Sequence, residues 1–143
     1  MMMRDILVPV DGSDGSNHAA RFAAFLARES GAKITLLHVH EASTAEMVGL
    51  ASQSQEQIHA REAGVAAGSF AGAREAIAEF DVETNEATRL GHPATEIVAA
   101  AQELRPQLVV MGSRGLSLMK ELLIGSVSDH VLRHAPCPVT IVR

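Results

Sequence analysis

Short apolar runs alternate with longer segments of helical composition along the chain. Unbroken apolar runs are typical of strands buried on both faces, whereas apolar positions recurring every three to four residues indicate helices. The pattern predicts strands at residues 6–10, 33–39, 81–87, 107–111 and 138–142, the third being the weakest, and helices at residues 17–30, 46–80, 94–104 and 126–134. Such alternation is typical of an α/β domain with a parallel sheet. We therefore expect one domain over residues 1–143, an open doubly wound sheet with helices on both faces.

Glycine and proline mark several of the expected helix ends. Gly31 follows the first helix as a C-cap, and Pro93 stands at the start of the third. Within the long second helix, Gly64, Gly68 and Gly72 recur every four residues on one face. We expect this face to pack closely on the sheet or on a second helix.

Two of the expected strand-to-helix loops are rich in glycine. The loop Asp11-Gly12-Ser13-Asp14-Gly15-Ser16 follows the first strand, and the segment MGSRGLSLMKELLIGSV, residues 111–127, begins as the fourth strand ends. Ligands of doubly wound sheets bind at the carboxyl ends of the strands, where the strand order reverses. If the first and fourth strands are neighbours at that point, the two loops face each other across one crevice.

The residue types in these loops suit a ligand that carries phosphate. Gly112 and Gly115 lack a Cβ, which lets backbone N–H groups approach a phosphate, and Gly125-Ser126 opens a helix whose first N–H groups attract anions. Asp11 is a candidate for contact with a ribose hydroxyl or with a divalent cation carried by the phosphates. Two plainer interpretations stay open: the glycines form a simple turn, and Ser126 with Asp129 forms a capping box.

Three motifs taken together resemble the universal stress protein family. They are the spacing G-x2-G-x9-G-[ST] from Gly112 to Ser126, V-P-V-D-G-S at residues 8–13 and C-P-V-T-I-V at residues 137–142, and the resemblance spans residues 6–142. The glycines are similar to those of the ATP-binding branch of the family; the other branch shares the fold and lacks them. The resemblance implies a five-stranded parallel sheet in the order 3-2-1-4-5. It also implies ATP, or ADP, with Mg²⁺ at the switch point, and a homodimer joined through the last strand.

Carried over position by position, the resemblance implies a nucleotide site with three parts. Its adenosine end is lined by Pro9, Val10 and Asp11, with the Val39 backbone at the adenine edge. Its ribose and phosphates are wrapped by Met111, Gly112, Arg114 and Gly115, and the phosphate site is completed by Gly125, Ser126 and Val127. We assign no catalytic residue, and the candidate metal contact is Asp11, through phosphate-bound Mg²⁺.

Composition narrows the range of partners. The formal net charge is −5, only two residues are lysine and the arginines are scattered, so neither nucleic acid nor a membrane surface is an expected partner. The apolar runs are too short for a membrane span or a signal peptide, so we expect a cytoplasmic protein. Aromatic residues make up 3% of the chain, with no Trp and no Tyr, so an adenine would be held by aliphatic side chains.

Histidine and cysteine offer weaker candidate sites. His38 and His40 share a strand face, and His130 and His134 share a helix face, so either pair could hold a metal. We favour structural or solvated roles, because no other ligand completes a set convincingly. Cys137 is the single cysteine, which excludes an intramolecular disulfide and favours a small buried apolar side chain.

Three functions are compatible with these motifs. The first is a stress-responsive regulatory module whose ATP-bound state is recognised by an unidentified protein partner. The second is a slow ATPase or phosphotransferase, which needs positioned cations and a group that orients the nucleophile; the loop offers Arg114 and Lys120 but no evident base. The third is a dimer that keeps the fold without binding nucleotide, which the intact glycines disfavour. We expect the binding module.

Overall fold

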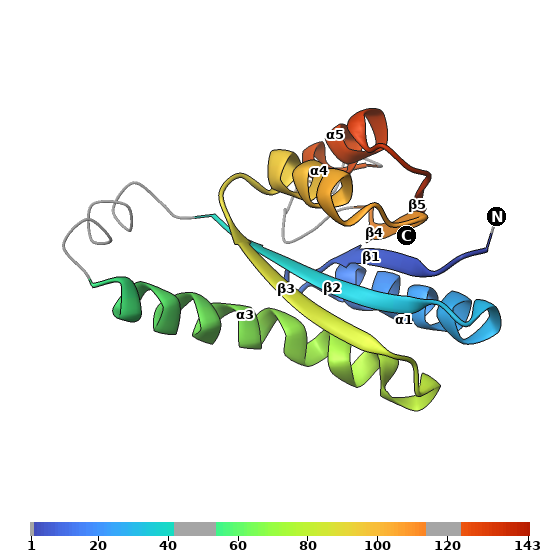
Figure 1. The fold of residues 1–143 in the computed structure, drawn as a ribbon, viewed down its shortest axis with the longest axis horizontal. Coiled ribbons are helices and arrows are strands. Elements are labelled where there is room, and N and C mark those ends of the chain that lie inside the picture. The colour runs from blue at the N-terminus through green and yellow to red at the C-terminus, as the bar shows by residue number, and fades with distance from the viewer. Residues whose placement is uncertain (1, 42–53, 114–123) are drawn as a thin grey trace.

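Five parallel strands form one sheet at the centre of the molecule (Figure 1). The structure is a computed structural model, and it describes residues 2–41, 54–113 and 124–143. The spatial order β3-β2-β1-β4-β5 is the predicted one. The strands are β1 (Asp5–Pro9), β2 (Lys33–His40), β3 (Thr84–Leu90), β4 (Leu108–Gly112) and β5 (Val139–Val142). In register, Ile6 of β1 lies beside Ile34 of β2 and Leu108 of β4, so the strand order reverses at β1.

Helices cover both faces of this sheet, as predicted (Figure 1). One face carries α1 (Asp14–Ser30) and α3 (Gln55–Ile77), which continues into the 3₁₀ turn η1 (Ala78–Phe80), and the other carries α4 (Pro93–Leu104) and α5 (Ser126–His134). Val8 points into the core under α1 and α3, whereas Leu7 points into the core under α4 and α5. Because successive residues of a strand point to opposite faces, a strand buried on both sides needs an unbroken apolar run.

Most element boundaries agree with the sequence prediction to within one residue, and those of α1, β3 and the long helix α3 do not. Helix α1 begins three residues early, at Asp14, because the Ser13 hydroxyl caps it by accepting the Ser16 N–H at 3.2 Å. Strand β3 is displaced by three residues toward the C-terminus, because Asp81 adopts a left-handed conformation (φ 48°) after η1.

The long helix α3 differs from its prediction in two ways. Ser54 has an extended backbone and forms a capping box with Gln57, so no continuous helix runs from residue 46, and residues 46–53 lie outside the described residues. The glycine stripe packs closely at Gly72, where a Cβ would lie 2.5 Å from Nδ2 of Asn17 on α1. A Cβ at Gly64 or Gly68 would meet nothing within 4 Å, so close packing was the wrong expectation there.

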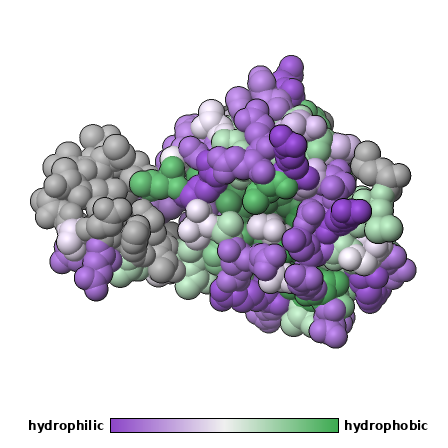
Figure 2. Space-filling view, in the orientation of Figure 1, coloured by the Kyte–Doolittle hydropathy of each residue, from purple (hydrophilic) through white to green (hydrophobic). Residues whose placement is uncertain are grey.

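The face of the molecule shown in the space-filling view is largely hydrophilic, with smaller apolar areas between the hydrophilic residues (Figure 2). No helix in the described ranges has both the length and the apolar character that crossing a lipid bilayer requires.

Candidate functional site

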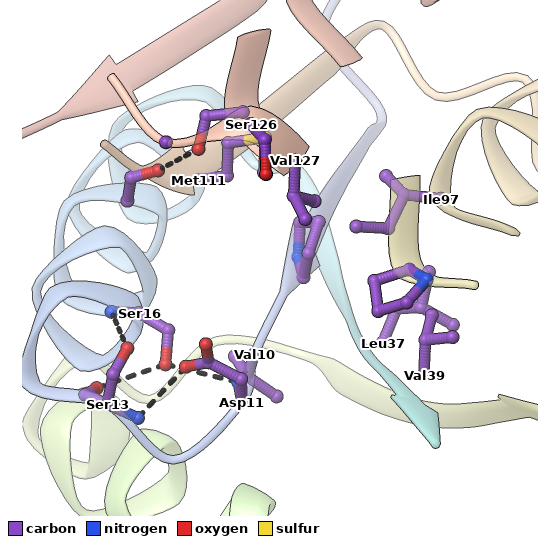
Figure 3. Close-up of a pocket in the computed structure, with 15 residues that line it drawn as sticks. Val10, Asp11, Ser13, Ser16, Leu37, Val39, Ile97, Met111, Ser126 and Val127 are labelled. Atoms are coloured by element: carbon purple, nitrogen blue, oxygen red, sulfur yellow. Dashed lines mark hydrogen bonds between the residues drawn. The ribbon is translucent and has the colours of Figure 1, made fainter. Parts of the chain in front are cut away.

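A pocket opens at the carboxyl ends of β1 and β4, where the strand order reverses (Figure 3). The chain leaves β1 toward α1 on one face of the sheet and reaches α5 after β4 on the other face. Connections that diverge in this way leave a crevice between them. The described residues that line it are Pro9, Val10, Asp11, Ser13, Ser16, Leu37, Val39, Pro93, Ile97, Met111, Gly112, Gly125, Ser126, Val127 and Ser128.

The structure brings together at this pocket every predicted site residue that it describes. These are Pro9, Val10, Asp11, Val39, Met111, Gly112, Gly125, Ser126 and Val127. The other two predicted residues, Arg114 and Gly115, lie outside the described residues. Ser113 and Gly125, on either side of that segment, lie close together, since the Gly125 N–H donates to the Ser113 carbonyl at 2.6 Å. The chain therefore leaves β4 and enters α5 at the same edge of the pocket.

One side of the pocket is aliphatic. Val127, Ile97, Leu37 and Val39 lie on this side in Figure 3, and Pro93 completes it. No aromatic side chain is among the described residues that line the pocket. Such a surface offers a flat apolar group dispersion contacts without ring stacking.

Sequence reasoning missed three residues on the aliphatic side, Leu37, Pro93 and Ile97. Leu37 could have been found, because it is two residues before Val39 and side chains two apart in a strand share a face. Pro93 and Ile97 come from the start of α4, which also follows a strand at the carboxyl edge of the sheet. The proline at the helix start was the available signal.

The polar side of the pocket is the loop between β1 and α1. The Ser13 N–H donates to Oδ1 of Asp11 at 3.0 Å, and the Ser16 hydroxyl donates to the Ser13 carbonyl at 3.1 Å (Figure 3). Gly12, which lies between Asp11 and Ser13, has φ +85°, a conformation that favours glycine. These bonds hold the Asp11 carboxylate at the pocket. Asp11 is the one acidic residue among the described lining residues, and Ser13 and Ser16 were missed because they were assigned to a turn.

Gly112 has a packing role that the sequence did not reveal. A Cβ at this position would lie 2.9 Å from the carbonyl carbon and 3.0 Å from the carbonyl oxygen of Gly15. The end of β4 therefore meets the backbone of the first turn of α1 directly. This contact requires a glycine at 112 whether or not a phosphate binds nearby.

Helix α5 begins at the pocket without a side-chain cap. Its N-cap is Gly125, in extended conformation (φ −71°, ψ 164°), and no side chain accepts a hydrogen bond there. The proposed capping box of Ser126 with Asp129 is therefore wrong: Ser126 is the first helical residue, and Asp129 pairs with Arg133. Ser128 is used internally, since its hydroxyl donates to the Gly112 carbonyl at 2.8 Å.

The electrostatics of the pocket are set largely by helix ends. Helices α1, α4 and α5 all begin at its walls, so the positive ends of three helix dipoles converge there. At α1 the Ser13 side chain already caps the helix, and at α4 the first residue is Pro93, which has no N–H. Among these three helices, α5 has the first turn whose N–H groups are best suited to an anion, because no side chain caps it.

His38 lies behind the pocket and joins β2 to the loop after β1. It is buried, with its Nδ1 3.3 Å from the Val10 carbonyl and its ring edge against Phe70 of α3. Its Nε2 has no hydrogen-bond partner among the described residues. Burial lowers the pKa of His38, and the nearby His40 lowers it further, against the opposing effects of the Val10 carbonyl and Asp11. The neutral ring donates from Nδ1 to Val10.

The remaining histidine pair and the single cysteine have structural surroundings in the described part of the chain. The described residues contain no group of three or more His, Cys, Asp or Glu side chains that could hold a metal ion. The rings of His130 and His134 stack at 4.3 Å, and Nδ1 of His134 lies 2.9 Å from the His130 carbonyl. Cys137 is half-buried against the core under α5, and this burial raises the pKa of its thiol, as suits a small apolar side chain.

Comparison with known proteins agrees with the motif and the fold. The sequence profile of the universal stress protein family matches residues 2–143. Universal stress protein YxiE of Bacillus subtilis (strain 168) is 37% identical, over 99% of this chain and 100% of its own length.

Two solved structures of similar proteins contain nucleotides. A universal stress protein in complex with cAMP has a TM-score of 0.73 at 26% identity, covering 100% of this chain and 99% of that chain. The universal stress protein from Archaeoglobus fulgidus in complex with dAMP has a TM-score of 0.69 at 25% identity, covering 100% of both chains. Profile, sequence relatives and structural neighbours lead to one conclusion: this chain belongs to the universal stress protein family.

Proposed function

We propose that the pocket binds an adenine nucleotide, ATP or ADP, and that the protein acts as a regulatory module whose nucleotide-bound state is recognised by a partner. The observation that carries this proposal is the division of one pocket into two chemical halves. An aliphatic side, including Leu37, Val39 and Ile97, faces the polar loop after β1, and the uncapped N-terminus of α5 opens at the same pocket. A molecule with a flat apolar base and an anionic tail is complementary to both halves.

The two ends of the ligand have separate supports. The base fits the aliphatic side, and we assign recognition of its edge to the main chain of β2 at Val39, which lines the pocket. The phosphates fit the first turn of α5, at Gly125, Ser126 and Val127, because its backbone N–H groups have no side-chain cap and lie at the positive end of the helix dipole. The nucleotide-bound relatives support adenine as the base.

Asp11 is the residue we assign to the ribose or to a cation. Its carboxylate is held at the pocket by the Ser13 N–H, and a carboxylate either accepts a hydrogen bond from a ribose hydroxyl or attracts Mg²⁺. When bound, Mg²⁺ would neutralise phosphate charge close to this carboxylate. The described residues of the pocket fit this role for Asp11, and they supply no further acidic ligand.

The absence of aromatic chromophores makes the direct experiment simple. With no Trp and no Tyr, the purified protein absorbs very little at 280 nm, so a bound adenine would dominate its near-ultraviolet spectrum. We expect a peak near 260 nm that desalting does not remove and that denaturation releases as ATP or ADP, identified by chromatography and mass spectrometry. ATP with Mg²⁺ should also raise the melting temperature of nucleotide-stripped protein, since a ligand that binds only the folded state stabilises it.

Matched ligands make the test specific. GTP and inorganic triphosphate, each with Mg²⁺, distinguish recognition of adenine from general anion binding, and cAMP and dAMP test the ligands of the related structures. The proposal is overturned if no nucleotide is released and none of the adenine ligands raises the melting temperature. A homodimer through the edge strand β5 is part of the same proposal.

A further inference from the structure

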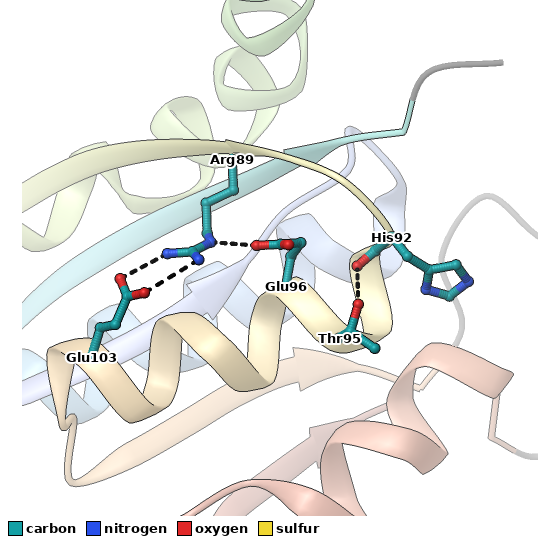
Figure 4. Close-up of polar contacts among 5 residues, drawn as sticks. All are labelled: Arg89, His92, Thr95, Glu96 and Glu103. Carbon is teal, nitrogen blue, oxygen red and sulfur yellow. Dashed lines mark hydrogen bonds and ion pairs between the residues drawn. The ribbon is translucent and has the colours of Figure 1, made fainter. Parts of the chain in front are cut away.

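Arg89 joins the edge strand β3 to helix α4 at two points (Figure 4). Its Nε donates to Oε2 of Glu96 at 2.7 Å, and its Nη1 and Nη2 donate to the two carboxylate oxygens of Glu103 at 2.9 and 3.4 Å. Glu96 and Glu103 are about two helical turns apart, so they lie in one row along α4. A planar guanidinium that holds both carboxylates resists sliding of the helix along the strand as well as rotation about its axis.

The turn between β3 and α4 is shaped around this ion pair. Gly91 has φ +147°, a conformation that favours glycine, and a Cβ there would lie 2.9 Å from Cγ of Glu96. The missing side chain thus leaves the space in which Glu96 folds back toward Arg89. The Gly91 N–H donates to the His40 carbonyl of β2 at 2.9 Å, which ties the same turn to the sheet.

The first turn of α4 is also a wall of the pocket. Pro93 and Ile97 line the pocket, and Ile97 directly follows Glu96. The Thr95 hydroxyl donates to the His92 carbonyl at 3.2 Å, so this turn is closed by its own hydrogen bonds (Figure 4). Arg89 and Glu96 keep only 26% and 27% of their side-chain surface exposed, so water screens this pair less than an open surface pair.

We propose that Arg89 is a positioning residue for the pocket. Through Glu96 and Glu103 it fixes the first turn of α4, and with it the Pro93–Ile97 wall against which the base packs. Arg89 is not among the described residues that line the pocket, so we assign it no contact with the ligand. The inference rests on the proposed nucleotide site for its effect on affinity, and on the ion pair alone for its effect on α4.

The test compares three variants that alter ion pairs on β3. Arg89→Met removes the guanidinium and keeps an apolar stem, and Arg89→Lys keeps a charge that can satisfy only one carboxylate well. Arg74→Met is the matched control, because it breaks the Arg74–Glu86 pair, which links the same strand to α3 on the opposite face. Affinities for ATP with Mg²⁺ and for adenosine are measured by calorimetry well below each melting temperature.

Adenosine has no phosphate, so its affinity reports on the position of the α4 wall and not on the charge of Arg89 near phosphates. We expect Arg89→Met to lower the affinities for adenosine and for ATP by the same factor, about threefold to tenfold. The affinities of Arg89→Lys should lie between those of Arg89→Met and the wild type. Arg74→Met should leave both affinities unchanged. The proposal is overturned if Arg89→Met binds adenosine like the wild type, or if only ATP is weakened, since the latter would show that Arg89 acts through its charge on the phosphates.

Amide hydrogen exchange in ligand-free protein tests the same role without any ligand. Arg89→Met should accelerate exchange in a peptide spanning residues 91–98, and Arg74→Met should not. If the wild type binds no adenine ligand, the proposed function fails while this exchange experiment still decides whether Arg89 fixes α4. Unchanged exchange at residues 91–98 would overturn the inference even if nucleotide binding were established.

Discussion

At Gly112 the end of β4 meets the backbone of α1 so closely that a side chain has no room. Because the atoms met at 2.9 and 3.0 Å belong to the backbone of Gly15, they cannot move aside as a flexible side chain would. We predict that Gly112→Ala destabilises the ligand-free protein by about 1–3 kcal/mol in urea unfolding. The control is Gly68→Ala in α3, where a Cβ meets nothing within 4 Å and removal of a helical glycine should stabilise by up to about 1 kcal/mol. Equal stability of Gly112→Ala and the wild type would contradict the packing role.

Ser126 allows the phosphate site to be tested without harm to the fold. It is exposed and is the first residue of α5, where an acidic side chain interacts favourably with the helix dipole, worth about 0.3–1 kcal/mol. We predict that Ser126→Asp keeps or raises the melting temperature but lowers the affinity for ATP by roughly tenfold or more, because like charges then meet at the binding site. Ser126→Asn, of similar size and neutral, should bind ATP much more tightly than Ser126→Asp. Adenosine affinity should be nearly the same in both, and a parallel loss of adenosine would place the phosphates elsewhere.

At the scale of elements, the helix boundaries that could be predicted are those marked by a glycine or a proline. Pro93 and Gly125 mark the starts of α4 and α5, and both helices lie where the sequence predicts them. The start of α1 was missed because Asp14, Gly15 and Ser16 have the composition of a turn. The Ser13 cap overrides that composition by satisfying a first-turn N–H.

Strand β3 was misplaced because edge strands carry a weaker hydrophobic pattern. With β2 on one side only, it alternates half-buried and exposed residues over much of its length instead of forming an apolar run.

The candidate site was predictable where it follows directly from strand ends, as at Val10 and Met111. It was not predictable at Ile97, because only the tertiary packing of α4 brings that residue to the pocket.

The contact between β2 and the loop after β1 predicts a pH dependence of stability. The unfolded chain takes up a proton on His38 near its ordinary pKa of 6.5, whereas the buried ring in the folded protein resists protonation until lower pH. The unfolded state therefore binds more protons between those two values, and stability falls as pH drops below about 6.5. His38→Asn retains a donor toward Val10 without a titrating ring, so its melting temperature should fall less between pH 7.5 and pH 5.5. An identical pH profile in both proteins would show that His38 does not contribute.

At the scale of the whole molecule, the sheet ends in an apolar edge strand. In the order β3-β2-β1-β4-β5, strand β5 has a neighbour on one side only, and its residues Val139, Thr140, Ile141 and Val142 are all half-buried. An apolar edge with unused backbone groups is a template for pairing with another chain. We infer that two copies pair through β5 in antiparallel fashion about a two-fold axis, because an isologous contact closes as a dimer.

The hydrogen bonds of β5 show how to break such a dimer without breaking the sheet. The carbonyls of Pro138, just before β5, and of Val142 accept N–H groups from Val109 and Ser113, so every second residue from Pro138 to Val142 turns its backbone groups toward β4. Val139 and Ile141 therefore direct their backbone groups outward. We predict that Ile141→Pro, which removes an outward donor, converts the dimer to a monomer in sedimentation velocity, whereas Ile141→Val, which trims the side chain and keeps the N–H, remains dimeric. Replacing Val139 and Ile141 together by lysine should also give monomers, through repulsion across the two-fold axis. A dimer that survives both Ile141→Pro and the double lysine variant would place the interface on another surface.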